Sequence, residues 1–390
     1  PAKLHHPSDP GWPGSWNGYF GKRAAADQES FTVMDDDAYV ALEYLPDSRD
    51  PTRRGLGLRV EVRGFQWANP QAGNVIFWHY DITNESTTDQ DSIIFGLYMD
   101  SGVGGSEWSC DQAFESDDDN AFWDRSAQLN LVYTWDTKGH GRDLAGSCSR
   151  TGYLGYAYLE TPGNEFDTLD NDQDGIRNES RVNVPTGPPV VGQPEILAAL
   201  VALGVDTVKF VRYYGPIAER PAYKAGVWFP ADEDMDWTAE LSDVGVDGVA
   251  GTHDAGEGDL TPTQGEPNFG RTDLNESDQI GLTGFNMNRI KAAPDNNDQA
   301  EDGIVFWDDG RGWPQELWKK FTHPVPAERF DPALVSNYNI GFLFASGPFR
   351  LKAGATERFS LALAYGANLT ELTTNVQTVQ KIYDANYQFA

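Results

Sequence analysis

The stretch GLGLRVEVR at residues 55–63 has an apolar side chain at every second position, with glycines and then charged residues between them. Leu58 and Val60 fall on one face of an extended chain, while Arg59 and Glu61 fall on the other. A period of two is typical of a β-strand with one buried and one solvated face. The stretch therefore predicts a half-buried strand.

Working outward, two β-branched and aromatic runs follow at residues 74–84 and 92–100, and with the first stretch they predict a three-stranded meander. The chain contains 12 Trp, 16 Tyr and 20 Phe beside 40 Gly and 23 Pro, a composition that suits strands joined by tight turns. We expect a mostly β fold, an antiparallel β-sandwich or jelly-roll-like arrangement with long acidic loops and a few short helices. Further strands are predicted at 128–135, 153–160, 207–214, 339–347 and 357–366.

Two helices interrupt the strand pattern. Pro194, the run EILAALVAL and Gly204 predict one short helix, because Pro suits a first turn and Gly a helix end. Asn368 and Glu371 form a capping signal for a second helix at the C-terminus. Its apolar residues recur at helical spacing and predict one buried stripe, which consists of Leu369, Leu372, Val376, Val379 and Ile382.

Composition shifts divide the chain into five segments. Residues 1–160 are predicted to form the N-terminal part of the sandwich, and residues 161–193 an acidic calcium-loop insertion. A short helix and a strand are expected over 194–231, followed by a long acidic loop region at 232–303. Residues 304–390 are expected to complete the β domain with strands and a helix.

The net charge of −31 makes cations the natural partners of this chain. Such a charge repels phosphate backbones and anionic lipid surfaces, so neither nucleic acid nor a basic membrane-binding patch is expected. A highly solvated surface, suited to a salty habitat, is the alternative reason for the charge. The sequence has no apolar run of 18 residues, so no transmembrane segment is predicted. No signal peptide is present, and we interpret a chain that opens at Pro1 as a processed, exported protein.

The sharpest motif is DNDQDGIRNE at residues 170–179. Alternate aspartates followed by a glycine place several carboxylates around one point, which suits a hard cation that takes six to eight oxygens. The predicted calcium ligands are three aspartates, a backbone carbonyl and a later bidentate carboxylate: Asp170, Asp172, Asp174, Ile176 and Glu179. The glutamate comes too early for an EF-hand, so the motif resembles the shorter loops of secreted calcium-binding repeats. A solvated acidic turn is the alternative.

Two weaker pairs accompany this motif. Asp117 and Asp119 form a possible second metal site, although neighbouring carboxylates in a chain point in different directions. Cys110 and Cys148 are the only cysteines and lie in polar, Gly-rich surroundings, which favours a disulfide over two unpaired thiols and supports export.

Catalytic motifs are absent: the sequence has no HExxH, no GxSxG elbow and no phosphate-binding loop. We therefore do not expect an enzyme, and we expect a structural protein. The alternative is a carbohydrate-binding or glycan-hydrolysing protein with Trp stacking and paired carboxylates, although no pattern selects such a pair. The tryptophans in loop-like segments, which could equally pack over the ends of the sheets, are Trp12, Trp16, Trp67, Trp108, Trp123, Trp307, Trp313 and Trp318.

Several longer phrases resemble one group of proteins. They include GWPGSWNGYFGK, GLGLRVEVRGFQWANP, FWHYDITNES, GYLGYAYLETPGN, GEPNFGRTDLNESDQIGLTGF, SGPFRLKAGATERFSLALAYG and IYDANYQF. The chain is similar, over nearly its whole length, to large secreted or cell-surface proteins of Bacteroidetes-like bacteria. That resemblance implies export through the outer membrane, with fibronectin-like modules and a sorting domain after the last phrase. It implies a location and no reaction.

Together these observations predict a secreted, calcium-binding structural or adhesive protein of the bacterial surface or extracellular space. The expected cofactor is calcium. The expected partners are other surface proteins, copies of the same chain, or glycans.

Overall fold

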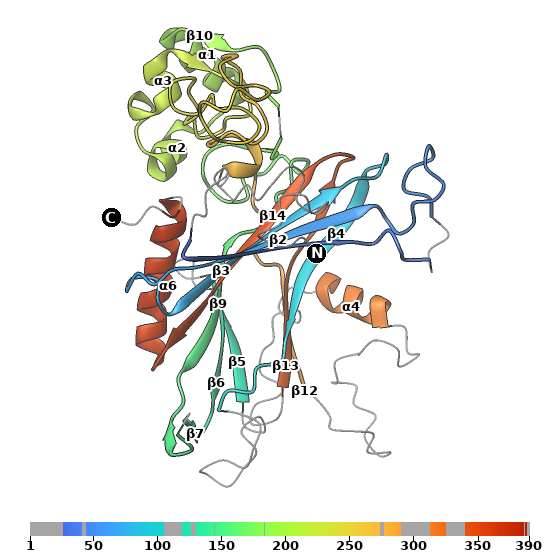
Figure 1. Cartoon of the computed structure of the whole chain (residues 1–390), viewed down its shortest axis with the longest axis vertical. Helices are drawn as coiled ribbons and strands as arrows, with labels where there is room; N and C mark the ends of the chain where they lie inside the picture. Colours follow the sequence, from blue (N-terminus) through green and yellow to red (C-terminus); the bar gives the residue numbers. More distant parts are fainter. Residues whose placement is uncertain are drawn as a thin grey trace.

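The computed structural model contains two antiparallel sheets packed face to face (Figure 1). The seven-stranded sheet has the strand order β1-β2-β3-β14-β9-β6-β5, and the three-stranded sheet has the order β12-β13-β4. This arrangement confirms the predicted mostly β, sandwich-like fold. The residues that the structure describes are 26–40, 44–104, 119–125, 130–143, 145–182, 184–273, 277–289, 313–324, 340–385 and 387.

Most strands lie where the sequence predicts them. The large sheet consists of β1 (Gln28–Asp35), β2 (Leu58–Gln66), β3 (Val75–Asn84), β5 (Asp119–Asp124), β6 (Leu131–Asp136), β9 (Tyr153–Glu160) and β14 (Thr356–Gly366). The small sheet consists of β4 (Gln90–Met99), β12 (Gly284–Arg289) and β13 (Ile340–Leu351). A separate hairpin pairs β7 (His140–Arg142) with β8 (Cys148–Arg150).

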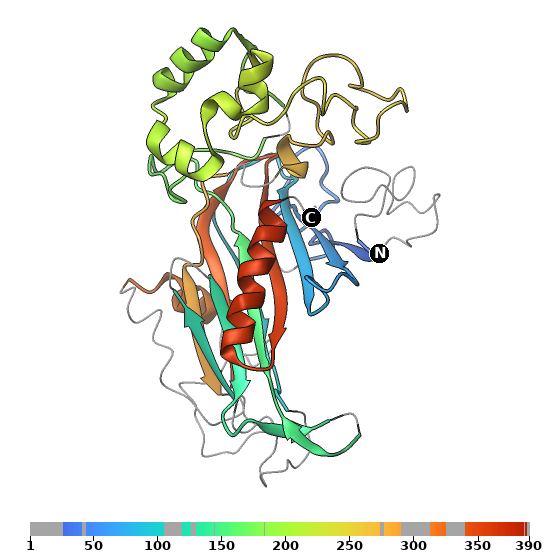
Figure 2. The ribbon, with the colours of Figure 1, turned by 90° about the vertical axis from the view of Figure 1, so that its left-hand side faces the viewer.

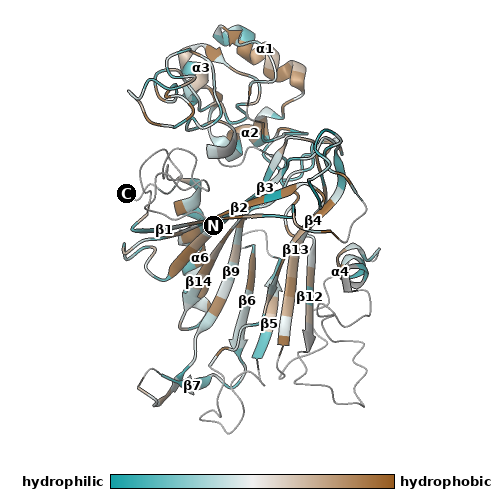
Figure 3. Cartoon of the chain, turned by 45° about the vertical axis from the view of Figure 1, so that its right-hand side comes forward, coloured by the Kyte–Doolittle hydropathy of each residue, from teal (hydrophilic) through white to brown (hydrophobic). Residues whose placement is uncertain are grey.

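The core between the sheets is aromatic. Tyr156 on β9 lies against Phe342 and Phe344 on β13, with ring centroids 5.7 Å apart in both pairs. Phe359 and Leu361 on β14 face the same layer, because alternate side chains of a strand point to one side of its sheet. Figure 3 shows hydrophobic segments along these strands, so apolar burial holds the two sheets together.

The predicted C-terminal helix is present as α6 (Leu369–Asp384) and covers the other face of the large sheet (Figure 2). The Asn368 side chain accepts a hydrogen bond from the Glu371 backbone N–H at 3.0 Å, and the Glu371 carboxylate accepts one from the Ala367 N–H at 3.1 Å. The buried stripe of the helix consists of Leu372, Val376, Val379, Ile382 and Tyr383. A shorter helix, α4 (Trp313–Thr322), packs against β12 and β13 of the small sheet through Phe321.

Between β9 and β12 the chain leaves the sandwich and forms a separate lobe, drawn above the sheets in Figure 1. We call residues 163–279 the insertion lobe. Its two ends pair through a β-bridge between Gly163 and Gln279, and the Asn164 N–H donates to the Asp278 carbonyl at 2.9 Å. The lobe therefore begins and ends at one point of the sandwich.

The insertion lobe contains short elements around a small core. They are β10 (Val190–Val191), α1 (Gln193–Leu203), α2 (Thr207–Tyr214), η1 (Ile217–Glu219), α3 (Pro221–Ala225), β11 (Val227–Trp228) and η2 (Gly270–Thr272). The buried core residues are Ile196, Leu200, Phe210, Ala222, Trp228 and Met235. The helix predicted from Pro194 and Gly204 is α1, with Gly204 as a left-handed C-cap.

The strand predicted at residues 207–214 is wrong, because this segment is helix α2. The Asp206 carboxylate caps it by accepting the backbone N–H groups of Val208 and Lys209. Phe210 and Tyr214, four residues apart, pack together on one side of the helix, with ring centroids 5.0 Å apart and the rings tilted by 52°. The apolar residues thus follow the helical period, and the capping aspartate decides between the two readings.

The predicted meander is also wrong in its third strand. β2 pairs with β3, but β4 pairs with β13 in the other sheet. The second edge of β3 is taken by β14, so β4 crosses the core and places Phe95 against Tyr80 with ring centroids 5.2 Å apart.

Candidate metal centre

The DNDQDG loop lies in the insertion lobe, packed against the start of helix α2. Gly175 has φ +103° and its carbonyl accepts the Asp206 N–H at 2.7 Å. A Cβ atom at this position would lie 2.5 Å from the Asp206 carbonyl oxygen. Glycine is therefore required here for both its backbone conformation and the close approach of the helix.

The structure brings the predicted carboxylates together. One oxygen from each of Asp170, Asp172 and Asp174 lies within 4.8 Å of the others, and so do oxygens of Asp172, Glu179 and Asp278. Because calcium–oxygen distances are about 2.3–2.6 Å, two ligands on opposite sides of one ion are about 4.6–5.2 Å apart. Both groups therefore have the spacing of a calcium site, and Asp172 belongs to both.

Backbone groups hold several of these carboxylates in place. Asp278 accepts N–H groups of Asn171 at 2.5 Å and Asn178 at 2.9 Å. Asp174 accepts the Ile176 N–H at 2.8 Å and the Tyr214 hydroxyl at 2.5 Å. These bonds fix the loop without neutralising its charge.

Glu179 is the exception. Its side chain is in a residue only 3% exposed, and both carboxylate oxygens are buried without a hydrogen-bond partner. A buried carboxylate with no donor is costly, because it has lost its water and gained nothing in exchange. Lys209, a cation of this region, forms its ion pair with Asp170, at 2.5 Å. Glu179 therefore faces a position that a cation would occupy favourably.

The carboxylates also disturb one another electrostatically. Burial, followed by repulsion from Asp174, raises the pKa of Asp172 to about 8. The same two causes, with Asp172 and Glu233 as further neighbours, raise the pKa of Glu179 to about 12. A cation placed among these groups would remove the repulsion and return the carboxylates to their ionised form.

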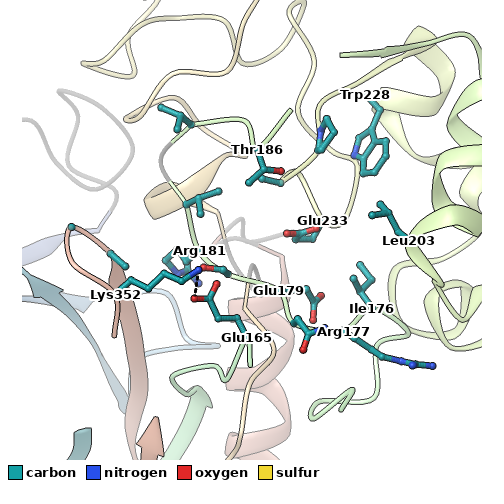
Figure 4. A pocket seen from close by; sticks show the side chains of 18 of the residues that line it. Glu165, Ile176, Arg177, Glu179, Arg181, Thr186, Leu203, Trp228, Glu233 and Lys352 are labelled. Atoms are coloured by element: carbon teal, nitrogen blue, oxygen red, sulfur yellow. Dashed lines mark ion pairs between the residues drawn. The ribbon is translucent and has the colours of Figure 1, made fainter. Parts of the chain in front are cut away.

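A cavity of about 560 Å³ lies beside the cluster, between the insertion lobe and the β13–β14 turn (Figure 4). Glu179 and Glu233 line it, together with Ile176. Glu165 and Lys352 form an ion pair at 2.6 Å across the cavity wall. The cavity gives the carboxylate cluster a route to solvent, which a metal site needs.

The donor set fits calcium better than zinc. All side-chain ligands in the two groups are carboxylates, and hard oxygen donors suit calcium or magnesium, whereas zinc sites favour His and Cys. The number of carboxylates exceeds what magnesium commonly takes from a protein. Ile176 contributes its N–H to the loop, and a role for its carbonyl stays a prediction.

The sequence did not reveal Asp278, because 100 positions separate Asn178 from Asp278 and only the fold brings them together. Of the second predicted site, Asp117 lies outside the described residues. Asp119 begins β5 and accepts the Val103 N–H at 3.2 Å. Cys110 also lies outside the described residues, so its disulfide with Cys148 stays a prediction.

The tryptophans that the structure describes are mostly buried. Trp67 lies in the core beneath α6, and Trp123 lies between the sheets. Of the other loop tryptophans, Trp318 on α4 is 43% exposed. The side chain of Trp313 lies outside the described set, as do Trp12, Trp16, Trp108 and Trp307. Of the loop tryptophans, Trp67 and Trp123 thus pack against the sheets, as the alternative reading of these residues expects.

No protein-family model, curated protein or solved structure matches this chain. Among the described residues, no helix has the length and apolar character needed to span a bilayer.

Proposed function

We propose that this chain is a secreted, calcium-binding structural or adhesive protein of the bacterial surface or extracellular space. The observation that carries the proposal is Glu179, a buried glutamate with two unpartnered oxygens beside Asp172 and Asp278. Calcium at this position would join the loop at 170–179 to the end of the lobe near 278. It would thereby close a long loop that little apolar burial holds.

Surface features of the insertion lobe support a partner. Helix α1 carries apolar residues on every side, and Val201 and Leu203 are 73% and 66% exposed. Val208 on α2 is 78% exposed. A helix that is apolar all round is usually covered, so this surface fits contact with another surface protein or a second copy of the chain.

Calcium titration calorimetry tests the metal part of the proposal. The wild-type protein should bind calcium, and Glu179→Gln should weaken binding at least tenfold because it removes a charged ligand. Glu240→Gln is the matched control, since Glu240 is an exposed glutamate of the same lobe. Equal calcium affinities of the two variants would contradict the proposal. Wild-type protein that binds magnesium as tightly as calcium would contradict it as well.

Light scattering in calcium tests the partner surface. Val201→Asp together with Val208→Asp should shift the protein toward monomer or abolish binding to purified cell surfaces, because two charges would be buried in the contact. Thr252→Asp adds the same type of charge at an exposed position outside the helices and should change nothing. A double variant that assembles and adheres like wild type would exclude this surface.

The described residues lend less support to carbohydrate binding or glycan hydrolysis. Of the described tryptophans, Trp67, Trp123, Trp228 and Trp237 are buried, while Trp318 is 43% exposed. A ring that stacks on a sugar must present its face to solvent. We therefore do not favour that alternative.

A further inference from the structure

A second acidic cluster lies elsewhere in the insertion lobe, in the turn after β11. The sequence there is ADEDMDW at residues 231–237, with aspartates at alternate positions. Met235 is fully buried in the lobe core, and its carbonyl accepts the Ala222 N–H at 2.9 Å. The turn holds Ala231 at φ +91° and Met235 at φ +65°, conformations that non-glycine residues seldom adopt. The core thus fixes this turn in one shape.

Four carboxylates converge on one point of the turn. One oxygen from each of Asp232, Asp234, Asp236 and Asp273 lies within 4.8 Å of the others, which is the spacing that calcium ligands require. Asp273 comes from after η2, and its carbonyl accepts a hydrogen bond from buried Arg181 at 2.6 Å. The fold therefore builds this group from two distant segments.

Each of the three turn aspartates has one buried oxygen without a hydrogen-bond partner. Asp232 is fully buried: its Oδ1 accepts the backbone N–H groups of Asp236 at 3.0 Å and Trp237 at 3.4 Å, while its Oδ2 has no hydrogen-bond partner. Oδ2 of Asp234 pairs with Arg220 at 2.5 Å, and its buried Oδ1 has no hydrogen-bond partner. Oδ1 of Asp236 is likewise buried without one. In Asp232 and Asp234 one oxygen is thus held by the protein and the other is left to coordinate a metal, which is the arrangement expected of metal ligands.

Charge balance points the same way. Arg220 approaches the cluster from the Asp234 side, where its Nε also donates to the Asp234 carbonyl. This guanidinium offsets the charge of Asp234, while Asp232 and Asp236 keep buried oxygens without a hydrogen-bond partner. A divalent cation would offset two more, and would give the buried oxygens the partner that Arg220 does not provide.

We propose that Asp232, Asp234, Asp236 and Asp273 form a second site for a hard divalent cation, calcium in an extracellular setting. The ligands are all oxygen atoms, and four carboxylates fill at least half of the six to eight positions that calcium takes. The site shares no ligand with the first cluster. Glu233, next in the chain to Asp232 and Asp234, lines the same cavity as Glu179 (Figure 4).

Metal counting tests the second site. The full-length protein is equilibrated with calcium and desalted into a buffer of fixed free calcium. Bound metal is then measured by elemental mass spectrometry, with the buffer as the blank. Asp236→Asn should lower the count by one ion relative to wild type. Asp236 is the right position because Asp232, not Asp236, holds the backbone of the turn. Asp91→Asn, at an exposed aspartate of β4, is the control and should keep the wild-type count.

If Asp236→Asn still binds calcium weakly, a thermal unfolding measurement decides the test. With calcium saturating, Asp236→Asn should lower the melting temperature of the lobe, because it removes a ligand. If Arg220 alone balances the cluster, the same variant should raise the melting temperature, because it removes like-charge repulsion. An unchanged ion count with a raised melting temperature would overturn the second site.

The two metal proposals fail separately. Asp172→Asn with Glu179→Gln should remove the first ion and leave the second. If that double variant loses an ion while Asp236→Asn loses none, the proposed function stands and the second site falls. The opposite result would leave the second site as the only calcium site of the lobe.

Discussion

The sandwich and the insertion lobe of this chain are stabilised in different ways. The sandwich buries large rings between its sheets, with Phe342, Phe344 and Phe359 all 0% exposed. The lobe buries six apolar residues in its main core and holds two groups of buried carboxylates in its loops. Apolar burial needs no cofactor, whereas a buried carboxylate cluster needs a counter-charge. By this comparison, an ion bound at the proposed sites would do in the lobe what buried aromatic residues do in the sandwich.

Truncation of a buried ring in the sandwich, which leaves a cavity, should give the largest loss of unfolding free energy. Phe344→Ala should destabilise the protein by about 3–5 kcal/mol, because it removes a ring packed against Tyr156 and Phe342. Urea unfolding should show the same loss with calcium and with chelator. Val208→Ala, at an exposed position of α2, should stay within about 0.5 kcal/mol of wild type. A calcium-dependent loss in Phe344→Ala would mean that the two regions are not stabilised separately.

Loss of a single bound calcium ion should give the next largest effect, confined to the lobe. At free calcium one hundred times the dissociation constant, each site stabilises the folded lobe by about 2.7 kcal/mol, and chelation removes that contribution. Hydrogen exchange should then accelerate at residues 170–179 and 278–281 but not in β13 or β14. Uniform acceleration across both regions, or none, would contradict the comparison.

The pH dependence of the calcium-free protein should give the smallest effect, expressed as the change in unfolding free energy per pH unit. The folded pKa of Asp172 is raised to about 8, well above its usual value of 3.8. Between these values the folded protein holds a proton that the unfolded chain has released, so stability falls as pH rises. The slope is about 1.4 kcal/mol per pH unit for each such group.

Urea unfolding at pH 5 and pH 7.5 measures this slope. In chelator the protein should be less stable at pH 7.5 than at pH 5, and Asp172→Asn should reduce the difference. With saturating calcium the fall should disappear, since the ion binds the ionised carboxylates. A calcium-free protein that becomes more stable as pH rises would show that these carboxylates are ionised without a metal.

Much of the sandwich and part of the candidate metal centre could be predicted from the sequence. Alternation at residues 55–63 and the capping signal at Asn368 are local, and local signals survive in the fold. The motif at 170–179 is local as well. Asp278 could not be predicted, because its place beside Glu179 depends on how the lobe closes.

The aspartates at 232–236 carried a signal that was missed. They have the same alternate spacing as those at 170–174, but Met235 stands where an acidic loop would have a small or polar residue. A methionine in such a loop indicates that the turn is anchored in a core. Helix α2 was missed for a related reason, since its apolar residues fit two periods and Asp206 decides between them.

The β-bridge between Gly163 and Gln279 brings the two ends of the lobe together, so the lobe can vary in evolution as one inserted segment. Because the chain departs and returns at neighbouring positions, the intervening sequence can lengthen, shorten or be exchanged without moving a strand of the sandwich. Arg181 is one of the residues that link the lobe to the sandwich: its buried guanidinium pairs with Glu160 of β9. A descendant that replaced the lobe would have to supply another cation at that point or give up the glutamate.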